Sequence, residues 1–252
     1  MSEISEQQRR HSAAHMMARA VMNLFDDVQV DIGPATDDGF YYDFDLPHRI
    51  TPEDFPKIEA EIARLIALDE PFVRKEVSAD EAKALLAGQK YKLERLADVV
   101  ADGGPISTYA VGDYVEMCRG PHVEHAKQIG VVKLTKIAGS YYRGDEKNKM
   151  LQRVYGIVAK DQKELDEIVA RAEEAKRRDH RILGKQLKLF TITEQVGPGL
   201  AHWLPRGARV RVAIEDYWRR KHYEAGYEIV YTPHVGKSNL WETSGHLSFY
   251  KD

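Results

Sequence analysis

Apolar residues near the start of the chain recur every three or four positions, the period of a helix with one buried face. This stripe comprises Ala14, Met17, Ala18, Val21 and either Leu24 or Phe25. The pattern predicts a helix over residues 5–25. The next apolar segments, residues 28–34 and 40–44, flank the turn sequence Asp37-Asp38-Gly39 and predict a β-hairpin.

Capped helices and further strands follow this hairpin. Thr51–Asp54 supplies a capping residue, a first-turn proline and acidic side chains, which predict a helix that runs to about Leu68. Ser78 begins a second capped helix that ends near Gly88. Strand patterns occur at residues 72–77, 107–109, 114–117, 131–137 and 151–159. Because these elements lack a regular β-α-β rhythm, we expect an α+β domain of mixed antiparallel sheet and helices.

The last third of the chain has a different character. Residues 162–188 are rich in charged side chains and predict a long, solvated helix between two domains. An amphipathic helix is expected over residues 210–224, followed by a strand over residues 228–232 that ends at Pro233. Residues 188–252 are few for an independent core, so we expect the chain to be part of a longer protein.

Composition narrows the class of protein. Hydrophobic residues make up 43% and charged residues 31%, as in a soluble globular protein. The net charge of −3 means that contact with nucleic acid requires a local basic patch. The single cysteine excludes a disulfide framework. No signal peptide or membrane-spanning run is apparent, and we expect a cytoplasmic protein without membrane contact.

Two short motifs carry the candidate chemistry. His11-Ser12-Ala13-Ala14-His15 and Cys118-Arg119-Gly120-Pro121-His122 each place two nitrogen or sulfur side chains four positions apart. Either motif alone is weak, because histidines often cap helices or pack in cores. Together they contain the only cysteine and three of the ten histidines. These four side chains suit a zinc site, or a metal-free site in which imidazoles act as acid–base groups and the thiol shapes the pocket.

Longer segments resemble threonyl-tRNA synthetases. The similarity is carried by HSAAHMMARAV, IGPATDDGFYYDFDL, YVEMCRGPHV, KLTKIAGSYYRGDEKNKMLQRVYG, RRDHRILGKQLKLF and the segment that begins at WLPRGARV. The two short motifs alone would also fit alanyl-tRNA editing proteins. The last segment excludes these, because it resembles the start of a class II catalytic domain.

The resemblance implies a domain order. An editing domain that deacylates seryl-tRNA would occupy residues 1–160, and a linker helix residues 161–187. The start of the class II catalytic domain would occupy residues 188–252. Its motif 1 would end at Pro233 and build the homodimer interface of the full-length enzyme. Because later catalytic motifs are absent, we expect no ligase activity from this chain, and a need for ATP and Mg only with the missing core.

The resemblance also implies roles for single residues. His11, His15, Cys118 and His122 would line the editing pocket, with Lys92 near the ester. Tyr42 would shape the amino-acid pocket, and Glu116 would bind the α-amino group at a position where some relatives have Asp. From composition alone, Lys92 would be a surface lysine and Tyr42 a core residue. For editing we expect metal-free catalysis, with zinc on the four pocket residues as the alternative.

The implied partner is tRNA(Thr), held at its acceptor end. Candidate phosphate contacts are Arg143, Lys147, Lys149 and Arg153, although such a basic cluster is often only solvated. The resemblance therefore predicts a hydrolase that removes serine from mischarged tRNA(Thr). The alternative is a catalytically inert tRNA-binding or zinc-stabilised module.

Overall fold

A computed structural model describes residues 4–249. It separates into two compact units, Met1–Ala172 and Glu173–Asp252. The first unit contains antiparallel sheets and several helices, which confirms the predicted α+β class for this part of the chain. Among residues 4–249, the structure has no helix with the length and apolarity that crossing a membrane requires.

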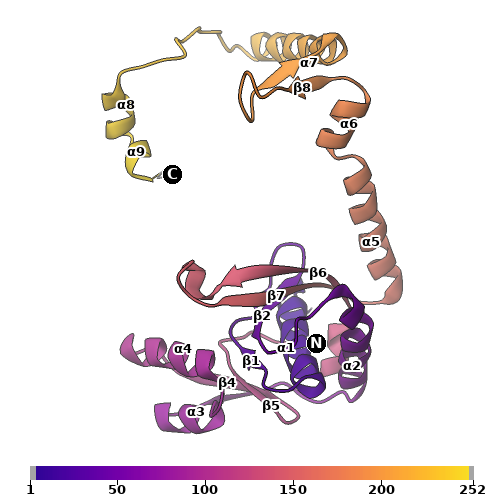
Figure 1. The fold of residues 1–252 in the computed structure, drawn as a ribbon, viewed down its shortest axis with the longest axis vertical. Helices are drawn as coiled ribbons and strands as arrows, with labels where there is room; N and C mark the ends of the chain where they lie inside the picture. Colours follow the sequence, from indigo (N-terminus) through magenta and orange to yellow (C-terminus); the bar gives the residue numbers. More distant parts are fainter. Residues whose placement is uncertain (1–3, 250–252) are drawn as a thin grey trace. The chain divides into compact units, whose positions relative to one another are not determined.

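A four-stranded antiparallel sheet organises the first unit (Figure 1). In spatial order its strands are β1 (Gln29–Val30), β2 (Phe40–Asp45), β7 (Met150–Ala159) and β6 (Val131–Tyr141). The predicted hairpin is present as β1 and β2, with Val30 opposite Phe44. Two helices, α1 (Glu6–Leu24) and α2 (Phe55–Ala67), pack against each other and against this sheet.

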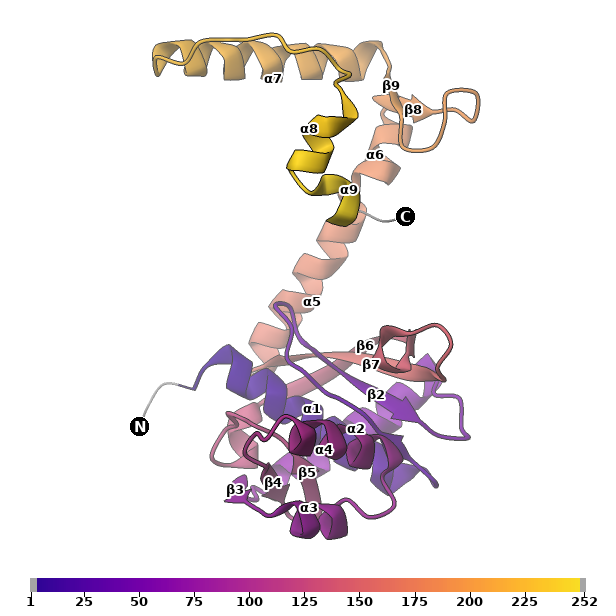
Figure 2. The same cartoon turned by 90° about the vertical axis from the view of Figure 1, so that its left-hand side faces the viewer.

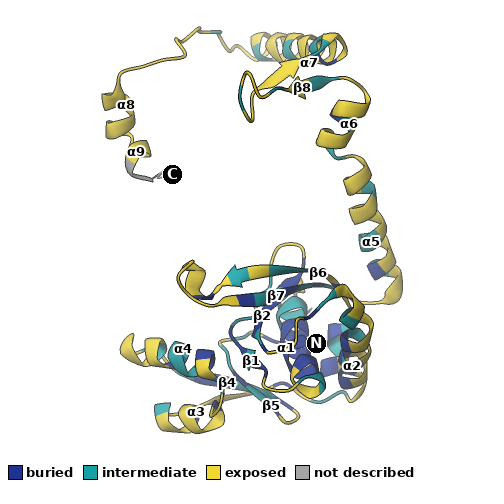
Figure 3. Ribbon diagram, viewed as in Figure 1, coloured by how far each residue is buried: buried dark blue, intermediate teal, exposed yellow. Residues whose placement is uncertain are grey.

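Helix α1 begins where the sequence predicts because Ser5 caps it. The Ser5 side chain accepts a hydrogen bond from the backbone of Gln8, and the Gln8 side chain accepts one from the backbone of Ser5. The burial of the helix differs from the predicted single stripe, since all residues from Ser12 to Val21 are buried. Figure 3 shows this burial at the centre of the first unit. The polar side chains of α1 therefore point into protein and need partners there.

A three-stranded antiparallel sheet forms the other part of the first unit (Figures 1 and 2). Its strands are β3 (Val73–Glu76), β4 (Ser107–Val111) and β5 (Tyr114–Met117). Helices α3 (Ala79–Leu85) and α4 (Lys90–Ala101) accompany it, with a small core of Ala82, Leu86 and Leu96. Helix α4 was not predicted, because Gln89 makes no side-chain capping bond and gives no start signal.

Short 3₁₀ turns complete the first unit. They are η1 (Pro52–Asp54), η2 (Ala126–Ile129) and η3 (Tyr142–Gly144). Helix α2 begins after η1, at the predicted proline-rich start. Strand β6 extends beyond its predicted end at residue 137 and continues to Tyr141, before η3 reverses the chain.

The charged segment after residue 160 forms two helices. They are α5 (Gln162–Arg177), whose Leu165 is buried, and α6 (His180–Gln186). The helix is interrupted because Asp179 adopts an extended ψ of 121° and its side chain caps the backbone of Arg181. The division between the compact units falls within α5. The domain boundaries at residues 160 and 187 stay predictions.

The second unit contains small elements with little burial, as Figure 3 shows. After the end of α5 and α6, they are β8 (Phe190–Ile192), β9 (Ala201–Trp203), α7 (Pro205–Glu224), α8 (Ser238–Thr243) and α9 (His246–Phe249). The strand predicted over residues 228–232 is wrong. No strand pairs with this segment in the described part of the chain, and Tyr231 is 92% exposed. Pro233, the predicted end of a dimer motif, lies in the same exposed segment.

Candidate active site

The structure brings the two short motifs together. His11 and His15 lie on successive turns of α1, and Cys118 and His122 lie in the loop after β5. One ligand atom from each of the four side chains lies within 4.8 Å of the others. The expected convergence of the two distant motifs is therefore confirmed.

Cys118 and His122 meet through a loop reversal, not through a helix. Gly120 has a φ of 71°, and the Gly120–Pro121 peptide bond is cis. A Cβ atom at Gly120 would run into the ring of Tyr109. The Gly-Pro pair inside this motif thus has a structural reason, since only glycine combines this backbone angle with so close an approach.

The thiol of Cys118 lies at the centre of the cluster. Its Sγ is 3.3 Å from Nε2 of His11 and 3.3 Å from Nε2 of His122. The backbone N–H of Gly120 also donates to this sulfur, over 3.2 Å. One thiol proton can serve only one of the two imidazoles at a time.

Ser12, which the sequence analysis did not single out, determines which nitrogen of His122 carries the proton. The Ser12 hydroxyl donates to the carbonyl of Gln8 (2.8 Å) and accepts from the N–H of Val123 (3.1 Å). Its single proton is thus used, so His122 Nδ1, at 3.0 Å, must be the donor to Ser12 Oγ. Neutral His122 then presents an unprotonated Nε2 towards Cys118. A serine inside a fully buried helical segment is the signal for such a role.

Glu116 sets which ring nitrogen of His15 carries the proton. Nε2 of His15 lies 3.3 Å from Oε2 of Glu116, and a carboxylate can only accept, so Nε2 bears the proton. The other ring nitrogen, Nδ1, is buried and has no hydrogen-bond partner in the described part of the chain. His15 thus holds an unprotonated nitrogen in a dry position next to His11 and His122, whose ring centroids are 5.1 and 4.3 Å away.

Glu116 organises the buried polar side of the site. Its carboxylate pairs with Lys92 of α4 and accepts from the hydroxyls of Tyr42 (2.6 Å) and Tyr114 (2.7 Å). Lys92 and Glu116 are each 4% exposed, so the expectation from composition that Lys92 lies on the surface is wrong. Lys92 is buried because the carboxylate neutralises it. With His15, four side chains surround Glu116.

Aromatic rings enclose His122 on two sides. The ring of Phe72 stacks on the imidazole with a centroid distance of 5.0 Å and an interplanar angle of 11°. Tyr109 approaches it edge-on at 4.4 Å. These rings remove water from the imidazole and fix its orientation.

Burial keeps the four cluster residues uncharged at neutral pH. It lowers the pKa of His15 to about 4 and also lowers the pKa values of His11 and His122. Burial raises the pKa of the Cys118 thiol to about 12. For Glu116, burial alone would raise the pKa, but the neighbouring His15 and Lys92 outweigh it and lower the pKa to about 2. The site therefore combines neutral imidazoles and a thiol with one buried ion pair.

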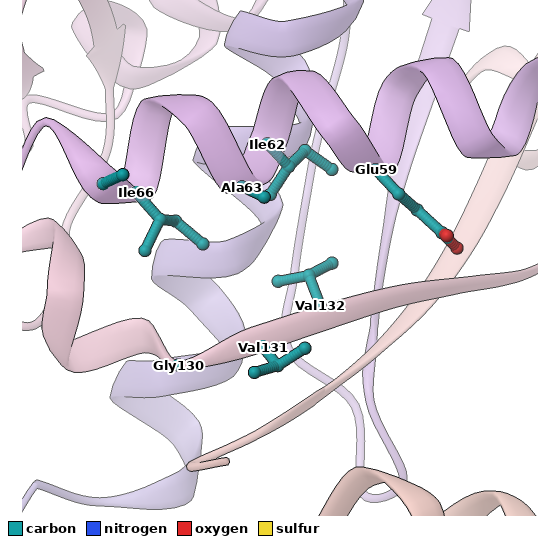
Figure 4. A pocket seen from close by; sticks show the side chains of 8 residues that line it. Glu59, Ile62, Ala63, Ile66, Gly130, Val131 and Val132 are labelled. Carbon is teal, nitrogen blue, oxygen red and sulfur yellow. The ribbon is translucent and has the colours of Figure 1, made fainter. Parts of the chain in front are cut away.

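An apolar pocket lies away from this cluster. Figure 4 shows it between α2 and the start of β6, where it has a volume of about 170 Å³. Its lining is mostly aliphatic, and its one carboxylate, Glu59, accepts a hydrogen bond from the backbone of Leu134. A larger cavity of about 420 Å³ is lined in part by Lys92 and Glu116, and Cys118 lines another of about 140 Å³.

The candidate phosphate contacts are mostly engaged within the chain. Arg143 pairs with Asp98 at 2.7 Å, and Lys149 with Asp45 at 2.7 Å. A further candidate, Arg153, makes two 2.7 Å hydrogen bonds to its partner Asp43 and lies over the ring of Tyr41. Within residues 4–249, no ion pair engages Lys147. Of these basic residues, Lys147 is thus the one whose charge is not internally compensated.

Comparisons with known proteins show which families the chain is similar to. Residues 106–155, which include Glu116 and both members of the Cys118–His122 motif, match the threonyl and alanyl tRNA synthetase second additional domain. This segment is therefore similar to a domain that is named for threonyl and alanyl tRNA synthetases.

Within that class, the similarity is to threonine–tRNA ligases. The chain is 50% identical to the ligases of Dehalococcoides mccartyi and Rhodopirellula baltica and 46% identical to that of Borrelia hermsii. Each match covers 96–97% of the chain. The chain spans 41%, 33% and 42% of these relatives, respectively. These matches confirm the resemblance found in the sequence.

Proposed function

We propose that this chain hydrolyses the ester of seryl-tRNA(Thr) and so removes serine that was attached in error. The observation that carries the proposal is the convergence of three neutral imidazoles and a thiol beside a buried Lys92–Glu116 pair. Relatives named threonine–tRNA ligases supply the expected partner, a tRNA.

The need for such a reaction follows from the size of serine. Serine differs from threonine by one methyl group, so it fits any pocket built for threonine. A missing methylene is worth only about 1–3 kcal/mol of discrimination. A second pocket that accepts serine and excludes the larger threonine adds the selectivity that binding alone does not supply.

The chemistry requires a water molecule, a base and a proton for the leaving group. The water oxygen attacks the ester carbonyl carbon, and the bond from that carbon to the ribose oxygen breaks. A neutral imidazole takes the proton of the water, and the ribose oxygen receives a proton as it leaves. His11 is the least buried imidazole of the cluster and thus the one that substrate reaches most directly. His15 and His122 lie behind it.

We assign supporting roles to the residues around this cluster. Burial is the main cause of the lowered pKa values of His11 and His15, and the buried positive charge of Lys92 lowers them further. The same charge would stabilise the negative charge that develops on the ester. Tyr42 would shape the amino-acid pocket through its hydroxyl on Glu116. For Glu116 to bind the α-amino group, the substrate would have to displace one of its present partners.

The proposal is tested by following ester loss from Ser-tRNA(Thr) and Thr-tRNA(Thr). We expect the chain to deacylate the serine ester at least tenfold faster than the threonine ester. His11→Ala should remove this activity, whereas His202→Ala, at an exposed position on β9, should retain it. Binding of tRNA without ester loss would contradict the proposal and favour an inert binding module.

Zinc is the second candidate chemistry, because the same four side chains are donors that zinc prefers. Their 4.8 Å spread exceeds the separation of about 3.3–3.8 Å between ligands of a tetrahedral zinc, so binding would draw them together. A bound zinc would require a Cys118 thiolate and would polarise an ester carbonyl. We favour metal-free hydrolysis. Stoichiometric zinc in the purified chain, with activity lost on chelation, would overturn that preference.

Capture of the tRNA is proposed to depend on exposed basic residues. Deacylation should slow as salt rises, because counterion release then contributes less to binding. Lys147→Ala should raise KM for Ser-tRNA more than Lys149→Ala does, since Asp45 already neutralises Lys149. Equal effects of the two variants, or a deacylation rate that does not change with salt, would show that these basic residues do not bind the tRNA.

The ligase reaction stays outside this proposal. The relatives are named for it, but the chain spans less than half of their length. Homodimer formation through the segment that ends at Pro233 likewise stays a prediction.

A further inference from the structure

Arg19 is a buried charge on the same helix as the two histidines. It lies four residues after His15, so His11, His15 and Arg19 follow one another along one face of α1. Its side chain is only 7% exposed. Arginine is rarely this buried without charged partners.

Two acidic residues from separate segments pair with Arg19. Its Nη1 contacts the carboxylate of Glu70, in the segment between α2 and β3. Its Nη2 lies 2.6 Å from Oδ1 of Asp113, in the turn between β4 and β5. A single guanidinium therefore joins α1 to two other segments.

The turn that contains Asp113 leads directly into the site. Strand β5 begins at the next residue, Tyr114, whose hydroxyl donates to Glu116, and Cys118 directly follows the end of this strand at Met117. The position of this turn relative to α1 therefore sets the position of Glu116 and Cys118 relative to His11 and His15.

The segment that contains Glu70 also reaches the site. Two residues later, Phe72 stacks on the ring of His122. The backbone carbonyl of Glu70 accepts from the N–H of Ala126, which holds this segment beside the chain that follows His122. Arg19 thus connects α1, which carries His11 and His15, to the segment whose Phe72 packs against His122.

The fit around the guanidinium is close. Gly112, next to Asp113, has a φ of 60°, and a Cβ atom at this position would run into the Arg19 guanidinium and the Glu70 carboxylate. The first turns of α1 have their own attachment, because Gln8 donates to the carbonyl of His122. Ser12 adds contacts to His122 and Val123, and Arg19 supplies an attachment beyond His15, so that α1 is held on both sides of its histidines.

We propose that Arg19 is a positioning residue, which holds α1 in register with the β4–β5 turn and the Glu70 segment so that the imidazoles face Cys118. This inference rests on the proposed deacylation. The contact between Cys118 and His11 of α1 is 3.3 Å long, so a small displacement of α1 would break it.

The test compares Arg19→Met with Arg19→Lys and with Val21→Ala, a core truncation on the same helix. We expect Arg19→Met to lower kcat for Ser-tRNA at least tenfold, with KM changed less than twofold. Arg19→Lys should recover much of kcat, because an ammonium can still reach one carboxylate. Val21→Ala should retain kcat, because it destabilises the helix without removing the attachment. Equal kcat values for Arg19→Met and Val21→Ala would overturn the proposal.

A second readout separates this inference from the proposed function. NMR cross-peaks between the rings of His15 and His122, whose centroids are 4.3 Å apart, should weaken in Arg19→Met and persist in Val21→Ala. If the unchanged chain does not deacylate Ser-tRNA, the proposed function fails and these cross-peaks alone decide the role of Arg19. If Arg19→Met does not fold, Asp113→Asn replaces it, since the Asp113 side chain is 83% exposed. Unchanged cross-peaks would then overturn the proposal.

Discussion

At the scale of single residues, the site depends on which nitrogen of each imidazole carries the proton, and neighbouring side chains decide this. The Ser12 hydroxyl makes His122 protonated at Nδ1, and the Glu116 carboxylate makes His15 protonated at Nε2. Each imidazole then keeps one unprotonated nitrogen, which is Nε2 next to Cys118 in His122 and the buried Nδ1 in His15. Cys118 stays a thiol because burial opposes its ionisation.

The single thiol offers a direct test of this arrangement. With its pKa raised from 9.0 to about 12, Cys118 should react with iodoacetamide at pH 8 roughly a thousandfold more slowly than an ordinary thiol, because only the thiolate reacts. Mass spectrometry after timed quenching measures the rate. The same chain unfolded in urea is the control and should react at the ordinary rate. Rapid modification of the folded chain would contradict a neutral thiol.

The same experiment distinguishes the metal-bound alternative. A zinc thiolate would also react slowly, but a chelator would then accelerate the reaction. We expect no acceleration, since the neutral thiol needs no metal to be unreactive.

At the scale of elements, the loop after β5 places the second motif. The reversal at Gly120 and the neighbouring Tyr109 ring bring His122 back to Cys118. Helix α1 supplies the first motif, with His11 at the edge of the buried residues 12–21 and His15 among them. The site therefore depends on a loop whose shape a single methyl group would disturb.

Replacing Gly120 should distinguish the cost of its positive φ from the cost of a contact between a new Cβ atom and Tyr109. Gly120→Ala should lower the free energy of unfolding by about 1–3 kcal/mol more than Gly88→Ala, and should also lower the deacylation rate. Gly88 has a similar positive φ of 85°, but a Cβ there meets nothing within 4 Å. Urea denaturation measures both variants. Equal losses of stability would show that the Tyr109 contact does not matter.

At the scale of the whole molecule, the buried histidines couple folding to pH. The pKa of His15 falls from 6.5 in the unfolded chain to about 4 in the folded chain, and those of His11 and His122 also fall. Between pH 6.5 and 4 the unfolded chain therefore binds protons that the folded chain does not. Stability is fully present above pH 6.5 and is lost as the pH drops through this window.

The expected slope is about 1.4 kcal/mol per pH unit for each histidine that stays neutral. Urea denaturation at several pH values from 7.5 to 4.5 measures it. His15→Gln should reduce the slope by the contribution of one histidine, whereas His202→Gln, at an exposed position, should leave the slope unchanged. A free energy of unfolding that does not change over this range would contradict the burial of neutral imidazoles.

The sequence by itself determined the local structure, the two motifs and the resemblance to threonyl-tRNA synthetases. Caps such as Ser5 and periodic apolar positions are local signals, so α1, the first hairpin and most strands of the first unit follow from them. The convergence of His11 and His15 with Cys118 and His122 was also predictable, but only through paired spacing and resemblance.

Only the tertiary structure decided those features of the site and the fold that depend on contacts between residues far apart in the sequence. From its residue type alone, Lys92 is expected on the surface. It is buried instead, because the carboxylate of Glu116, which lies on another element, neutralises its charge. Ser12 and Arg19 act through partners about fifty to a hundred positions away, which no local pattern reveals. The strand predicted at residues 228–232 has no partner in the described chain, because strand propensity alone does not supply a neighbouring strand to pair with.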